Sequence, residues 1–278
     1  RFAHPQSEPE QRIWGQLLSR STYGSIPPVH FKLALEAFEI ARKYNDLPEI
    51  AYCLWQRGFW AYVNQEHDQA IQLFEQSLSI YRQLGEPYDV ARVLMGRITR
   101  DHRADWEEKR ALAEELLRLQ REIGDHVGRG WSLSLLALNE GRLGHFTEAE
   151  RLLMERITIG RETGNLGLIA TSYALISHQV CFFQGNFAQA RAAADEALKL
   201  GNEISDSISI SGASATLGLL ANMNEDYSAA KRLCLEAVNA SVGYADFGKL
   251  ATWGLAVASC GLGHYEGARA QLSTALHY

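Results

Sequence analysis

Aromatic and amide side chains gather in one short stretch in the first quarter of the chain. Trp55 and Phe59 are one helical turn apart, and Tyr62 lies a further turn along roughly the same face. Gln56 adjoins Trp55, and Tyr52 comes one turn earlier. Rings with sparse amides suit a sugar, a small apolar metabolite or a peptide. The stretch therefore predicts a ligand site, and the alternative is that the rings only pack between neighbouring helices.

Polar side chains that could anchor such a ligand come next along the chain. Arg97, Asp101 and His102 are the predicted anchors, with Arg100 in the same cluster and Glu140 expected nearby. A buried charge needs partners, and a cluster of this kind can form a ligand site. The predicted ligand-binding residues are Tyr52, Trp55, Gln56, Phe59, Tyr62, Arg97, Asp101, His102, Trp131 and Gln179.

Residue patterns of known catalytic chemistry are missing from the sequence. It contains no GxxxxGK[ST], no GxSxG and no HExxH, and no two of its nine histidines have the spacing of helical metal ligands. We therefore predict that this chain is not an enzyme and that it carries no metal and no cofactor.

A repeat of about 40 residues must position the candidate residues. Its clearest copy runs from Asp125 to Gly164 and predicts two helices joined by a tight turn. One position just after the turn recurs in steps of 39, 40, 41, 40 and 38 residues, occupied by Ala70, Lys109, Ala149, Ala190, Ala230 and Ala268. A single pair would leave much apolar surface in water, so neighbouring pairs must cover it.

Glycines and caps predict where these helices begin and end. Gly144 is expected to end one helix, and Thr147 with Glu150 predicts a capping box at the start of the next. A second stop signal, glycine followed by an acidic residue or asparagine, occurs at four places: Gly85-Glu86, Gly124-Asp125, Gly164-Asn165 and Gly201-Asn202.

The position seven residues before each turn should hold a small side chain, because two helices cross there. Its occupants are Gly58, Arg97, Ala137, His178, Gly218 and Ala256. Arg97 and His178 break the rule. Either the register shifts locally or a helix tilts away, or these residues belong to a polar ligand cluster.

Composition limits the class of protein. The 278 residues are 46% hydrophobic and 22% charged, and a net charge of −6 argues against direct nucleic-acid binding. Leu250 to Leu262 is too short and glycine-containing to span a membrane. The four cysteines form no CxxC and suit buried hydrophobic positions in a reducing cytoplasm: Cys53, Cys181, Cys234 and Cys260. The chain begins at Arg1 rather than Met, so we expect a piece of a longer protein.

The pattern resembles tetratricopeptide repeats. First helices carry Leu136-Ala137, Leu217-Gly218 and Leu255-Ala256 seven residues before the turn, although the period exceeds the usual 34. The segments from Phe74 to Gly85 and from Arg142 to Ala149 look much like the arrays at the C-terminal end of STAND signalling ATPases, including regulators of the maltose-activator type. The resemblance implies a sensor that binds an inducer or a partner and relieves inhibition of an upstream ATPase, which is absent here.

The predicted fold class is all-α: a right-handed superhelix of six to seven tetratricopeptide-like helix pairs in a single domain. The expected divisions are a divergent N-terminal cap, 1–46, and repeats 47–84, 85–123, 124–163, 164–203, 204–242 and 243–278. The leading functional hypothesis is a domain that binds a small-molecule or peptide inducer in the concave groove. The alternative is a scaffold that binds a partner protein or peptide.

Overall fold

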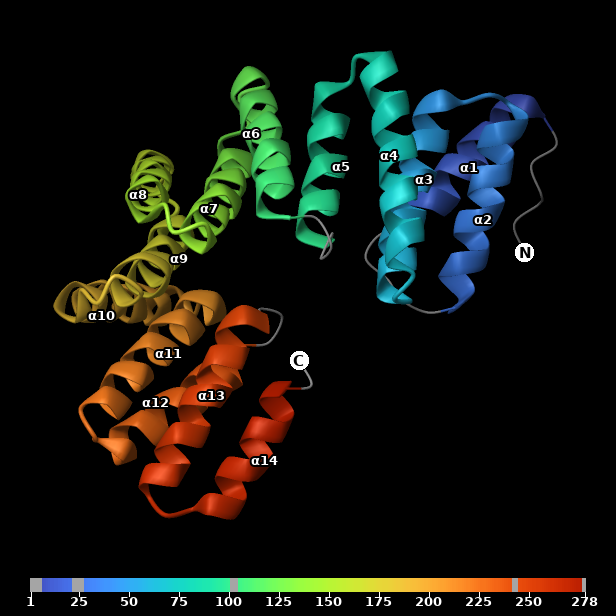
Figure 1. The fold of residues 1–278 in the computed structure, drawn as a ribbon. Coiled ribbons are helices and arrows are strands. Elements are labelled where there is room, and N and C mark those ends of the chain that lie inside the picture. Colours follow the sequence, from blue (N-terminus) through green and yellow to red (C-terminus); the bar gives the residue numbers. More distant parts are fainter. Residues whose placement is uncertain (1–6, 22–27, 101–104, 242–244, 277–278) are drawn as a thin grey trace. The chain divides into compact units, whose positions relative to one another are not determined.

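Every described element of the chain is a helix (Figure 1). The computed structural model describes residues 7–21, 28–100, 105–241 and 245–276. Within these ranges there is no β-strand, and the helices form seven consecutive pairs. The predicted fold class, an all-helical array of helix pairs, is confirmed.

The first compact unit, Arg1–Asp125 (unit 1), contains three pairs. Short connections bring each helix back alongside its predecessor, and α3 contacts both α1 and α5. The pairs are α1 (Glu8–Ser21) with α2 (Pro28–Lys43), α3 (Leu47–Val63) with α4 (His67–Leu84), and α5 (Pro87–Arg100) with α6 (Trp106–Glu122).

The second compact unit, His126–Tyr278 (unit 2), contains four pairs. In the second of these pairs, the first helix changes from α to π winding partway along, so that α9 continues as η1. The pairs are α7 (His126–Arg142) with α8 (Phe146–Thr163), α9 (Leu166–Leu175) and η1 (Ile176–Phe182) with α10 (Phe187–Ile204), α11 (Ser207–Met223) with α12 (Tyr227–Ala240), and α13 (Ala245–Gly261) with α14 (Tyr265–Leu276).

Left-handed residues end most of these helices, as the glycine pattern predicts. Gly85, Gly124, Gly144 and Gly164 have φ between +68° and +84°, a conformation that costs little only for glycine. Asparagine or aspartate caps the next helix at several starts, where its side chain accepts a backbone N–H: Asp46, Asp105, Asn165, Asp206 and Asp226.

Two boundary predictions are wrong. The helix after Gly144 begins at Phe146, with His145 at the N-cap and no side-chain cap, so Thr147 already lies inside α8. Gly201 does not end its helix either, because α10 continues to Ile204 and Ser205 takes the left-handed turn. Gly201 is instead a contact point, where an added Cβ would lie 2.4 Å from Ser209 Oγ.

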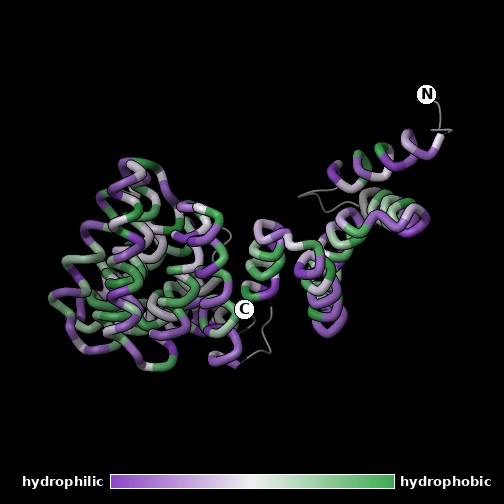
Figure 2. The backbone as a smooth tube through the Cα atoms, turned by 90° about the horizontal axis from the view of Figure 1, so that it is seen from above, coloured by the Kyte–Doolittle hydropathy of each residue, from purple (hydrophilic) through white to green (hydrophobic). Residues whose placement is uncertain are grey.

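Small residues let the helices of each unit approach closely. A Cβ at Gly58 would lie 2.8 Å from the Phe74 ring, and one at Gly218 would lie 2.5 Å from Cys234 Sγ. Ala137 and Ala256 are buried at the same predicted position. Apolar and polar residues alternate along the helices (Figure 2), as expected when one face of each helix packs against neighbouring helices and the other faces solvent. No described helix is both long and apolar enough to cross a membrane.

One exception to the small-residue rule, His178, lies on the π-helix η1. Its wider winding takes in more residues per turn, and it occurs where the repeat is longest, 41 residues from Ala149 to Ala190. Ser177, fully buried with Oγ 3.3 Å from Thr216 Oγ1, packs against α11 there. His178 is also buried, and its ring lies 5.0 Å from that of Phe183 and 6.3 Å from that of Phe247.

The cysteines provide a chemical test of this packing. Burial raises the pKa of Cys53 and of Cys234 to about 12, and raises that of Cys181, whereas Cys260 is exposed, contrary to prediction. Because the thiolate is the reactive form, an aromatic disulfide reagent at mildly alkaline pH should modify one thiol per folded chain and four in denaturant. A Cys260→Ser variant should lose the fast reaction, and rapid labelling of a second thiol would contradict the packing.

Candidate functional site

The predicted aromatic stretch lies on α3 in unit 1. Tyr52 is buried, whereas Trp55, Phe59 and Tyr62 are each partly exposed. The rings of Tyr52 and Trp55 are 5.6 Å apart and tilted by 44°. Three of the four rings are therefore only partly covered by protein.

Arginines from α1 and α5 stack on these rings. The Arg20 guanidinium carbon lies 3.7 Å from the Tyr52 ring centroid, and that of Arg100 lies 4.4 Å from the Phe59 centroid. Arg92 lies 5.0 Å from Tyr52 and 5.1 Å from Trp55, so each contact is within cation–π range. We call this surface the arginine–aromatic face; it consists of Arg20, Tyr52, Trp55, Phe59, Tyr62, Arg92 and Arg100.

Carboxylates and a buried phenol hold two of the arginines in place. Arg20 Nη1 lies 3.0 Å from both carboxylate oxygens of buried Glu49. Arg92 pairs with Asp89 at 2.6 Å and donates a hydrogen bond to Tyr81 Oη at 3.1 Å. Burial raises the pKa of Tyr81, so its hydroxyl stays protonated. The guanidinium planes are thus set before any ligand arrives.

Gln56 and Arg97 lie apart from this face. Gln56 is 4% exposed, and its Nε2 donates a 2.7 Å hydrogen bond to the Ser19 carbonyl of α1. Arg97 forms ion pairs of 3.0 Å with Glu75 and 2.6 Å with Glu108. Both side chains are therefore already engaged within unit 1.

Gly96, the residue before Arg97, is a closely packed position of α5, since a Cβ there would lie 3.1 Å from Trp55 Nε1. Arg100, rather than the predicted anchor Arg97, stacks on Phe59. The other two predicted anchors, Asp101 and His102, lie outside the described residues.

The two remaining predicted residues belong to unit 2. Trp131 is 46% exposed and borders a narrow cavity of about 20 Å³ beside Arg156. Gln179, on η1, is 9% exposed and borders a much larger cavity of about 680 Å³. Glu140, which we expected near Arg97, accepts a 2.7 Å hydrogen bond from His145 Nδ1 within unit 2.

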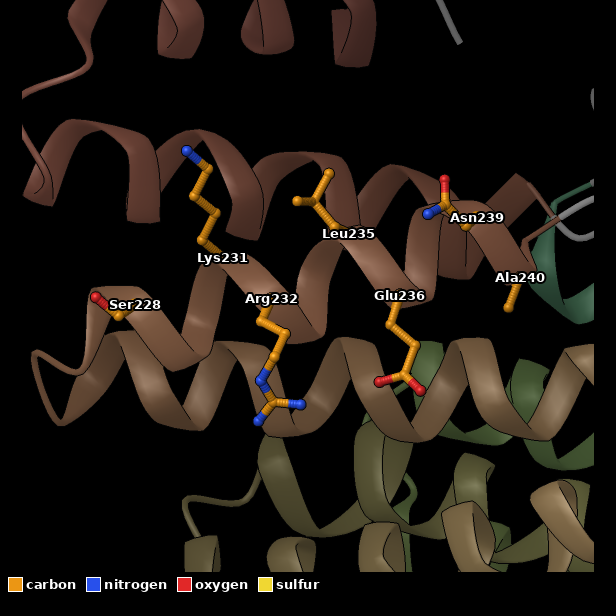
Figure 3. A pocket seen from close by; sticks show the side chains of 7 residues that line it. All are labelled: Ser228, Lys231, Arg232, Leu235, Glu236, Asn239 and Ala240. Carbon is orange, nitrogen blue, oxygen red and sulfur yellow. The ribbon is translucent and has the colours of Figure 1, made fainter.

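A third cavity, of about 750 Å³, runs along α12 (Figure 3). All the side chains in the figure rise from this one helix, so no second element contributes chemistry to it. Glu236 is already within 3.2 Å of Ser214 Oγ, the hydrogen-bond donor. Separate elements do not converge here as they do at the arginine–aromatic face.

Metal chemistry has no visible centre in the described part of the chain. No group of three or more histidine, cysteine, aspartate or glutamate side chains there is placed to hold a metal ion. The side chains of the arginine–aromatic face suit binding through rings and guanidinium groups.

Comparisons with known proteins concern the fold. No protein-family profile and no curated protein matches the sequence. Among solved structures, aspartyl phosphate phosphatase F from Bacillus subtilis has a TM-score of 0.69 at 14% identity, covering 97% of this chain and 69% of that protein. The apo form of the quorum sensor NprR from B. thuringiensis has a TM-score of 0.58 at 14% identity, covering 96% of this chain and 74% of that one.

A third solved structure contains the kind of array that the sequence resembles. It is the Pyrococcus horikoshii STAND protein with a tetratricopeptide repeat sensor, with a TM-score of 0.61 at 14% identity. The match covers 95% of this chain but only 43% of that protein. At such identities a likeness shows the fold alone, and that fold is a tetratricopeptide-like array of helix pairs.

Proposed function

We propose that this chain is the ligand-binding sensor domain of a signal-transducing protein, either a STAND-type ATPase or a transcriptional regulator. The inducer binds on the arginine–aromatic face, and the ATPase domain lies in the rest of the protein. Its tetratricopeptide-like fold, also present in a STAND sensor protein and in a quorum sensor, supports this role. We place the domain in the cytoplasm, in agreement with its free cysteines.

The partial exposure of the rings is the observation that carries this proposal. On the neighbouring first helix α5, Leu94 and Ile98 occupy the corresponding slots and are 0% and 5% exposed. Aliphatic side chains thus satisfy the packing there, so rings are not needed at Trp55 and Phe59 for stability alone. Guanidinium groups stacked on rings recognise an anionic group beside a flat apolar one. The inducer is therefore an anion with an apolar or aromatic part.

A scaffold that binds a partner protein is the second candidate function. Unit 2 exposes several large aromatic side chains, with Trp131 46%, Phe183 58% and Trp253 51% exposed. Exposed apolar groups of this size mark contact surfaces on many proteins. If this function is the true one, capture from lysate should depend on Trp253 and not on Trp55.

The test is a calorimetric screen of anionic metabolites and acidic peptides, followed by variants. We expect Trp55→Ala to weaken binding of the best ligand by roughly tenfold or more, because a central ring is lost from the contact. Trp253→Ala removes a tryptophan of unit 2 that is 51% exposed, more than the partly exposed Trp55, and serves as the control. Circular dichroism melting verifies that both variants fold. Equal affinity of Trp55→Ala and wild type would exclude the arginine–aromatic face.

A further inference from the structure

The cavity beside Gln179 is built from three separate parts of unit 2. The end of α7 and the following turn form one wall, η1 forms the second, and α13 forms the third. Its volume of about 680 Å³ is within the usual range for small-molecule sites. The lining residues that determine its chemistry are Gly141, Arg142, Gln179, Phe183, Lys249 and Leu250.

Gln179 contributes its side-chain amide to the lining of this cavity. Its side chain is 9% exposed, and the amide forms no hydrogen bond with any other residue that the structure describes. A Cβ added at Gly141 would lie 3.6 Å from Gln179 Oε1, so the lack of a side chain at 141 keeps the amide open to the cavity. The amide therefore faces the cavity, where a ligand group with donor and acceptor atoms can exchange hydrogen bonds with it.

The charge of the lining favours an anion. Lys249 forms no ion pair or hydrogen bond within the described part of the chain, and Arg142 brings a second cation to the rim. None of the lining residues is acidic. An ammonium group without a carboxylate partner, at the edge of a cavity, suits a carboxylate on the ligand.

Apolar side chains complete the walls. Phe146 and Leu250 are half-buried, and Phe183 is 58% exposed. The Phe183 ring centroid lies 5.0 Å from that of His178, which is buried beneath it. An aliphatic group on the ligand would cover these rings and remove them from water.

We propose that this cavity binds a small carboxylate carrying an adjacent amide and an aliphatic side chain, the chemistry of an N-acyl amino acid. The carboxylate pairs with Lys249, the acyl amide exchanges hydrogen bonds with Gln179, and the aliphatic group packs on Phe183 and Leu250. This site lies in unit 2 and uses none of the arginine–aromatic face. Its success or failure is therefore distinguishable from that of the inducer site in unit 1.

N-acetyl-leucine is the probe, and its uncharged carboxamide is the matched ligand control. Titration of the full chain, followed by the NMR signals of the Gln179 side-chain amide, should show saturable shifts with the acid and roughly tenfold weaker binding of the carboxamide. Lys249→Gln and Gln179→Leu should each weaken binding of the acid by a similar factor, with calorimetry used where the amide signal is lost. Lys199→Gln and Gln189→Leu, on the exposed surface of α10, should not.

Gly141→Leu gives an independent test, because it fills the cavity without removing a polar group. It should abolish binding of N-acetyl-leucine while Trp55→Ala leaves that binding unchanged. A longer probe, acetyl-Gly-Gly-Leu, distinguishes a site for the C-terminal end of a peptide from a site for a free metabolite. If the site binds peptide ends, it should bind this probe at least as tightly as N-acetyl-leucine. If it binds a free metabolite, it should exclude the longer probe. Absence of saturable shifts with both acids, or equal binding of acid and carboxamide, would overturn the proposal.

Discussion

Replacing Arg156 with alanine should lower the free energy of unfolding of unit 2 by about 3–5 kcal/mol, because a buried charged hub is lost. Arg156 is 4% exposed on α8. Its guanidinium donates to the carbonyls of Gly130 at 2.8 Å and Leu168 at 2.9 Å. It also donates to Thr171 Oγ1 at 2.7 Å and Ser172 Oγ at 2.8 Å. One side chain thereby ties α8 to both α7 and α9.

Two further variants separate the causes of this loss. Arg156→Met keeps most of the side-chain volume but donates no hydrogen bonds. If both the packing and the hydrogen bonds contribute, its stability should fall between those of wild type and Arg156→Ala. Arg151→Ala, on the same helix, removes an arginine whose side chain is 58% exposed and whose partners are surface glutamates, and it should cost less than about 1 kcal/mol. Urea unfolding monitored by circular dichroism compares the three. A cost for Arg156→Ala no larger than that for Arg151→Ala would show that the hub does not stabilise the unit.

The helix ends and the repeat period could be predicted because short stretches of sequence determine them. A helix end is decided within a few residues, by a left-handed glycine such as Gly85 or a cap such as Asn165. The period then follows from repetition, and small crossing residues such as Gly58 and Gly218 follow from the period. For this reason the repeat predicts that the described helices follow one another as pairs along the chain.

Where prediction failed, contacts between different pairs were decisive. Gly201 has the local pattern of a helix stop, yet it serves a close contact with Ser209 on the next helix. The π-winding of η1 occurs where Ser177 meets Thr216 of α11, a contact that no short window of sequence reveals. Arg156 looks like an interruption of an apolar helix face, and its partners lie on two other helices.

The candidate site shows the same division. The spacing of Trp55 and Phe59 on one helix was visible in the sequence. The arginines that stack on this helix were not, because Arg20 comes from α1 and Arg92 from α5. Their positions depend on how the first helices of the three pairs in unit 1 are turned toward one another, which also brings Arg100 of α5 to Phe59.

Introducing a carboxylate at Leu136 should be comparably severe. Leu136 lies on α7 beside the crossing residue Ala137, and the two are 4% and 2% exposed. Leu136→Asp removes apolar burial and places a charge where the close packing leaves no room for water. We expect a loss of about 3–5 kcal/mol in the unfolding free energy of unit 2 at neutral pH.

The pH dependence of this variant distinguishes charge from lost volume. Burial raises the folded-state pKa of an introduced carboxyl group above its unfolded value, so the penalty is full at neutral pH and shrinks as the pH falls through the carboxyl range. Leu136→Asn introduces a side chain of nearly the same shape as aspartate but without its charge, so its stability should show no such recovery relative to wild type at low pH. Leu235→Asp, at a position 41% exposed on α12, should lower the stability little at any pH. Thermal melts of the four chains across that pH range make the comparison. A melting temperature of Leu136→Asp equal to that of wild type would mean that α7 does not pack as the structure has it.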